Sequence, residues 1–131
     1  MKSTKIFFIL FILLSSSIKS DSSIKENMVL AESFFEDNLY DLAIIEYKRI
    51  NTKYPKNKYS NHISMKIADC YEKMGYYLKS INQYKSILVN EKNNWLAIFN
   101  ISRINHMMGE YNESNNIIDF NLDNFQNGRL D

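Results

Sequence analysis

The stretch that decides the fold is ADCYEKMGYYLKSINQY, which runs from Ala68 to Tyr84. At its centre a glycine-containing turn, residues 73–77, separates two segments whose apolar residues recur at helical spacing. Small residues such as Ala68 and Ser80 allow two helices to cross closely, and Gly75 suits the left-handed conformation that ends a helix. The stretch therefore predicts a helix-turn-helix unit.

The same pattern occurs three times along the chain. The turn KMGYY at 73–77 has counterparts in EDNLY at 36–40 and MMGEY at 107–111, and each lies between two apolar-periodic segments. Gly109 follows Gly75 by one repeat length of about 34 residues, whereas Asn38 precedes Gly75 by that length plus a short insertion. The chain is therefore built from a repeated unit of about 34 residues, with a short insertion after the first unit.

This repeat resembles the tetratricopeptide repeat (TPR), a helix-turn-helix unit of about 34 residues with small and aromatic residues at fixed positions. The third unit keeps the spacing with fewer matching residues. The resemblance implies an all-α fold, in which three TPR units stack as a short right-handed α-solenoid. The residues of the first two units that fit the pattern are Asn27, Leu30, Ala31, Phe34, Ala43, Tyr47 and Pro55, followed by Ser64, Ile67, Ala68, Tyr71, Ser80 and Tyr84.

The predicted TPR domain covers residues 24–128. In the last outer helix, Asn115 and Asn121 replace apolar residues, as in a terminal capping unit, and residues 125–131 are expected to form a short tail. The three units are expected at about 24–57, 61–94 and 95–128, with helices at about 24–37, 40–53, 60–74, 77–90, 95–108 and 111–124.

The first twenty residues have the order of a signal peptide. Lys2 and Lys5 precede an apolar run from Ile6 to Leu14, and serines follow it. Nine apolar residues in a helix rise only about 14 Å, roughly half of a hydrocarbon core. We therefore predict a cleaved signal peptide at 1–20 and a secreted or periplasmic protein, with retention as an N-terminal membrane anchor as the weaker interpretation.

The composition argues against several classes of function. A formal net charge of +1 gives no case for a clustered basic face, so no nucleic-acid partner is expected. Three glycines leave little for phosphate or dinucleotide loops, and no Cys/His set has the spacing of zinc ligands. We therefore expect neither a cofactor nor a metal.

Catalysis is also not expected from the individual reactive residues. His62 and His106 lie in different units and have no Ser or Cys partner in a recognisable motif. Cys70 takes a position that normally holds a small core residue, which favours a buried, inert thiol. The sequence accordingly predicts a protein that is not an enzyme.

One pair of carboxylates has the spacing of a general acid and base. Asp69 and Glu72 lie about one helical turn apart, but Lys66 and Lys73 flank them at spacings that suit ion pairs on a helix surface. We therefore interpret the two carboxylates as members of such ion pairs.

In TPR proteins the first helix of each unit lines a concave groove, and the resemblance implies the same here. An apolar lining rich in methionine and phenylalanine suits an extended peptide or an amphipathic helix. The expected partner is therefore a protein or peptide. The residues predicted to line this groove are Met28, Glu32, Phe35, Met65, Lys66, Asp69, Leu96, Phe99, Arg103 and His106.

Residues 35–60 also resemble exported bacterial TPR proteins in which Tyr-Pro ends the first unit and a short insertion follows. That group includes the TPR lipoprotein of the outer-membrane β-barrel assembly machine and the periplasmic coordinator of the Tol-Pal system. The resemblance implies an adaptor of the cell envelope that associates peripherally with the membrane through a complex. The chain lacks the lipidation cysteine and has fewer repeats than the assembly lipoprotein. A structural protein that assembles into homo-oligomers stays open as the main alternative, and a small-ligand or enzyme role stays open as a third.

Overall fold

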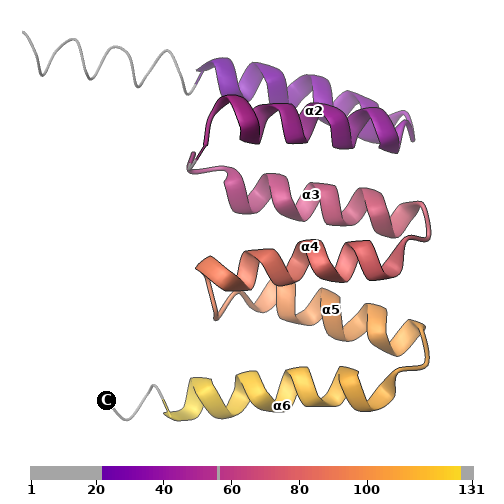
Figure 1. Ribbon diagram of the computed structural model, residues 1–131, viewed down its shortest axis with the longest axis vertical. Helices are drawn as coiled ribbons and strands as arrows, with labels where there is room; N and C mark the ends of the chain where they lie inside the picture. The colour runs from indigo at the N-terminus through magenta and orange to yellow at the C-terminus, as the bar shows by residue number, and fades with distance from the viewer. Residues whose placement is uncertain (1–21, 56, 128–131) are drawn as a thin grey trace, which may run out of the picture. The chain divides into compact units, whose positions relative to one another are not determined.

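The computed structural model describes residues 22–55 and 57–127, and every regular element in these ranges is an α-helix. None of these helices is long and apolar enough to cross a membrane. The predicted signal peptide at 1–20 lies outside the described residues. The helices comprise residues 22–36, then α2 (Tyr40–Lys53), α3 (Ser60–Lys73), α4 (Tyr77–Asn90), α5 (Trp95–Met107) and α6 (Tyr111–Asn127) (Figure 1).

The chain divides after Tyr54 into two compact units. The first contains the helix of residues 22–36 and α2, and the second contains α3 to α6. In the second unit α3 packs on α4, α4 on α5 and α5 on α6, so that two helical hairpins stack in chain order (Figure 1). The bounds of α2 and α4 are those that the sequence predicts.

The three predicted turns share one backbone geometry. Asn38, Gly75 and Gly109 have φ angles of 61°, 78° and 82°, which is the left-handed conformation that glycine adopts without steric cost. In the middle turn, the Gly75 amide donates to the Glu72 carbonyl and the Tyr76 amide to the Tyr71 carbonyl, each at 2.8 Å. The same two hydrogen bonds recur in the other two turns, so each first helix ends in a Schellman motif.

Small residues mark the crossing of the two helices in each hairpin. Ala68 and Ser80 are completely buried, and the Ser80 Oγ donates to the Ala68 carbonyl at 2.9 Å. In the following hairpin, the Ser102 Oγ lies 2.8 Å from the Ser114 Oγ and donates to the Ser114 carbonyl at 3.2 Å. The helices can come this close only because neither position carries a large side chain. The predicted role of these residues is confirmed.

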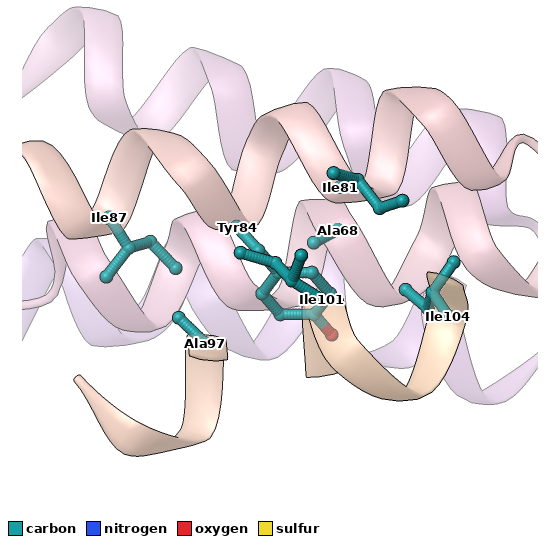
Figure 2. Packing of buried hydrophobic residues seen from close by; sticks show 7 residues of the cluster. All are labelled: Ala68, Ile81, Tyr84, Ile87, Ala97, Ile101 and Ile104. Carbon is teal, nitrogen blue, oxygen red and sulfur yellow. The ribbon is translucent and has the colours of Figure 1, made fainter. Parts of the chain in front are cut away.

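The core of the second unit is a continuous apolar cluster drawn from three helices. Ala68 of α3, three residues of α4 and three of α5 are at most 5% exposed. Figure 2 shows these side chains gathered where α4 and α5 face each other. Stacking of one hairpin on the next therefore buries a core that neither could bury alone. The cluster consists of Ala68, Ile81, Tyr84, Ile87, Ala97, Ile101 and Ile104.

The last helix differs from the expected polar cap and tail. It continues through Asn127, so residues 125–127 are helical where the sequence predicted a tail. Asn121, interpreted from the sequence as a sign of a terminal capping unit, is buried, and its Nδ2 donates to the Ile117 carbonyl at 2.6 Å. Phe120, in contrast, is exposed. Of the two asparagines that indicated a capping unit, Asn115 is therefore exposed and Asn121 is buried.

Replacing Ala68 by leucine should destabilise the protein, because Ala68 and Ser80 are both completely buried where α3 crosses α4 and leave no room for a larger side chain. We expect a loss of about 1–3 kcal/mol in the free energy of unfolding, measured by urea denaturation. The matched control is Asn82→Leu, which adds a leucine at an exposed position of α4. Equal stabilities of the two variants would contradict the close-crossing account.

Candidate functional site

The predicted groove residues of the second unit lie on α3 and α5, the first helices of its two hairpins. On each of these two helices, the groove positions repeat every three or four residues and so follow one face of the helix. We call the two stripes together the α3–α5 face. It comprises His62, Met65, Lys66, Asp69, Glu72 and Lys73 of α3 and Leu96, Phe99, Asn100, Arg103, His106 and Met107 of α5.

An ion pair joins the two helices across this face. Arg103 Nη1 donates to Glu72 Oε1 at 2.8 Å, and Arg103 Nη2 donates to Glu72 Oε2 at 2.7 Å. Nη2 also donates to Asn100 Oδ1 at 3.1 Å. The hydrogen bonds to Glu72 raise the pKa of Arg103 above its ordinary value. This planar, two-pronged geometry fixes both side chains more tightly than a lysine could.

A second polar contact connects the face to the core. The Tyr84 ring is completely buried, while its hydroxyl donates to Asp69 Oδ1 on α3. Burial, followed by the hydrogen bond to Asp69, raises the pKa of Tyr84, so the phenol stays protonated and acts as donor. Tyr84 and Arg103 thus contact the carboxylates of Asp69 and Glu72, two contacts that the sequence did not predict.

Between these polar groups, α5 presents apolar side chains to solvent. Leu96, Phe99 and Met107 are between 55% and 59% exposed, which is unusual for three large apolar residues on one helical stripe. His106 is exposed as well, and its ring packs edge-on against Tyr111 with centroids 4.8 Å apart. Met65 is only half-buried, although it packs against the core cluster.

The three groove residues predicted in the first unit differ in exposure. Met28 is buried, so the expectation that it lines an exposed groove is wrong for this residue. It follows Ile24 by one helical turn, and both belong to the buried face of the helix of residues 22–36. Glu32 and Phe35 are half-buried, and the Phe35 ring packs edge-on against Tyr40 with centroids 5.4 Å apart.

The pairing of Glu72 with Arg103 was not predicted. Arg103 lies one repeat length after Asp69 and not after Glu72, so the ion pair joins positions that are not equivalent in the two units. Repeat spacing alone therefore does not indicate this contact. Tyr84 was predicted only as a residue that fits the repeat pattern, and the contact of its hydroxyl with Asp69 was not predicted.

The potential nucleophile of the second unit is not accessible. Cys70 is completely buried, and burial together with the nearby Asp69 carboxylate raises the pKa of its thiol to about 12. Within residues 22–55 and 57–127, no three His, Cys, Asp or Glu side chains are grouped so that they could hold a metal ion. Cys70 therefore does not contribute a reactive group to the α3–α5 face.

Comparison with known proteins identifies the fold. No protein-family model and no curated protein sequence matches this chain. Solved structures do match it, and one is PcrH in complex with the chaperone-binding region of PopB. Its TM-score is 0.63 at 11% identity, over 73% of this chain and 75% of PcrH. The TPR domain of Arabidopsis FLU has a TM-score of 0.63 at 11% identity, over 82% of this chain and 98% of that domain. The fold is that of TPR proteins.

A third TPR structure extends this result. The TPR domain of P58(IPK) matches with a TM-score of 0.65 at 18% identity, covering 79% of this chain but 29% of P58(IPK). At such identities the likeness concerns the fold alone. The predicted all-α TPR architecture is therefore confirmed, and the α3–α5 face corresponds to the first helices of two TPR units.

The coupling between Glu72 and Arg103 should be measurable by a double-mutant cycle with Glu72→Gln and Arg103→Gln. Because both side chains are partly exposed, we expect a coupling free energy of about 0.5–1 kcal/mol that decreases with added salt. The control is the pair Glu46 and Arg49 on α2, a neighbouring pair on one helix, for which about 0.3 kcal/mol is expected. A coupling at Glu72 and Arg103 no larger than in the control would contradict the bridging role.

The thiol of Cys70 should react slowly in the native protein. A pKa of about 12 leaves roughly a thousandfold less thiolate at neutral pH than the ordinary value of 9.0. Labelling with a maleimide should therefore be much slower in buffer than in denaturing urea, and it should stay slow up to about pH 10. Native labelling at the denatured rate would show that Cys70 is accessible.

Proposed function

We propose that this chain is a non-enzymatic protein-interaction module that binds a peptide or a helix on the α3–α5 face. The observation that carries the proposal is the exposed apolar stripe of Leu96, Phe99 and Met107 beside a polar network that is already paired. Exposed apolar side chains grouped on one face are typical of sites that a partner covers.

The arrangement of the face suits a partner with spaced apolar residues. Leu96 and Phe99 lie about one turn apart near the start of α5, and Met107 lies at its end, so apolar contacts extend along the helix. Between them, Arg103 and Asn100 present fixed hydrogen-bonding groups. Because Glu72 already holds Arg103, little conformational entropy remains to be lost when a partner binds. PcrH, which shares this fold, was solved with the chaperone-binding region of PopB, and this supports a binding role.

We further propose that the protein acts in the cell envelope, as a secreted or periplasmic adaptor. Support comes from the signal-peptide pattern of residues 1–20 and from the Tyr54-Pro55 end of the first unit with the insertion that follows it. In this role the protein would associate peripherally with the membrane through a complex such as β-barrel assembly or Tol-Pal. Its partner would be a protein or a peptide, and nucleic acid would not be among its ligands.

Self-assembly is the second candidate, and one observation in the first unit favours it. Leu39, which directly precedes α2, and Leu42 and Ile45 of α2 are all exposed and follow one another every three residues. An apolar stripe of this kind on a second surface could join copies of the chain. A mass that rises with protein concentration would support this alternative, and a constant monomer mass would exclude it.

Charge placed on the α3–α5 face should abolish partner binding. The variant Leu96→Asp/Phe99→Asp introduces carboxylates at two exposed positions, so the fold is retained while apolar contacts with a partner are lost. We would recover the tagged full chain from the cell envelope after in vivo cross-linking and identify co-purified proteins by mass spectrometry. Proteins that co-purify with the unmodified chain should be absent from the variant.

The matched control for this experiment is Val89→Asp, at a site on α4 that is 78% exposed and lies outside the α3–α5 face. Its set of co-purified proteins should equal that of the unmodified chain. The same partners with all three proteins would contradict binding on the α3–α5 face. Recovery of only the chain itself would overturn the adaptor proposal in favour of self-assembly.

A further inference from the structure

A cavity of about 600 Å³ lies between α4 and α6, away from the α3–α5 face. Both helices pack on α5, and the cavity occupies the space that remains between them. Leu88 of α4 and the side chains of Ile117 and Phe120 of α6 supply its apolar lining. Its volume falls in the range of sites that bind small molecules, which are mostly apolar with a few polar groups.

The apolar wall on α6 is a departure from the repeat. Ile117 and Phe120 lie one repeat length after Gln83 and Ser86, which are polar residues on the outer side of α4. Phe120 is 68% exposed, so core packing does not explain why phenylalanine stands where the preceding repeat has serine. An exposed aromatic residue at the edge of a cavity gains apolar contacts once the cavity is filled.

The opposite change occurs at the next position of α6. Asn121 stands where the repeat has Ile87, which is completely buried in the core of the unit. The Asn121 amide also lines the cavity, with its Nδ2 held by the Ile117 carbonyl. Compared with α4, α6 therefore has a polar residue at the position equivalent to Ile87 and apolar residues at two positions that line the cavity.

The charged lining of the cavity is of one sign. Lys85 lies about one helical turn before Leu88 on α4, and Lys92 lies in the turn that follows α4, and both line the cavity. No carboxylate is among the described residues that line this cavity. The ammonium groups therefore favour an anionic group next to the apolar surface.

We propose that this cavity binds an anionic amphiphile, a single aliphatic chain with a terminal carboxylate. The chain lies against Leu88, Ile117 and Phe120, and the carboxylate pairs with Lys85 or Lys92. This proposal does not depend on protein binding at the α3–α5 face, because the cavity and that face share no residue.

The test is isothermal titration of the full chain with dodecanoate below its micelle concentration. We expect saturable binding of one molecule. Butyrate, which keeps the charge and shortens the chain, and dodecyltrimethylammonium, which keeps the chain and reverses the charge, should each bind at least about tenfold more weakly. Equal affinity for dodecanoate and either control ligand would overturn the proposal.

Variants then locate the site. Lys85→Gln/Lys92→Gln should weaken dodecanoate binding by about tenfold, whereas Lys79→Gln, at an exposed position of α4 outside the cavity and the α3–α5 face, should leave it unchanged. Phe120→Asp should also weaken binding, and its control is Leu78→Asp, at a position 66% exposed and outside the cavity. Circular dichroism identifies any variant that fails to fold, and the comparison of ligands on the unmodified chain does not depend on the variants. Unchanged affinity in folded Lys85→Gln/Lys92→Gln would overturn the assigned site.

Discussion

The close crossing of two small residues in each hairpin is the constraint on which the rest of the structure depends. Ser80 bonds to the carbonyl of Ala68, twelve positions earlier, and Ser102 and Ser114 meet at the same separation in the next hairpin. Such contacts require the helices to approach closely, so the large side chains must fill the space beside the crossing. The residues in the left-handed conformation end the first helix of each hairpin, so that the second helix runs back along it and the small residues meet. Repetition of this crossing in each successive unit then generates the TPR architecture.

The candidate site follows from the same geometry. Tyr84 fills the space beside the Ala68 crossing, and because its ring is fixed there, its hydroxyl can reach Asp69 on the neighbouring helix. Stacking of the two hairpins brings α5 beside α3, where Arg103 meets Glu72. These paired polar groups frame the exposed apolar residues of α5. Core packing thus prepares a surface on which the carboxylates of Asp69 and Glu72 are already hydrogen-bonded while three apolar side chains of α5 stay exposed.

Spacing and residue size determine the fold, which is why it could be predicted from the sequence. The bounds of α2 and α4 and the three turns follow from periodicity and from the residues at turns and crossings. A repeat pattern does not describe how its units differ or how neighbouring helices cover a face. For this reason the pattern did not predict that Met28, which occupies a groove position, is buried. The ion pair of Glu72 with Arg103 forms between two units, so the pattern of a single unit does not predict it. Asn121 matches a capping residue in the sequence, yet its side chain is buried.

The central claim is that the α3–α5 face is the surface at which a partner protein binds. Its most direct test is photo-cross-linking in intact cells, with a photoreactive amino acid in place of Phe99 and, separately, in place of Val89. The account predicts that position 99 gives a cross-link to a different protein, identified by mass spectrometry, and that position 89 does not. Cross-links from position 99 only to copies of the chain itself, or the same products from both positions, would contradict it.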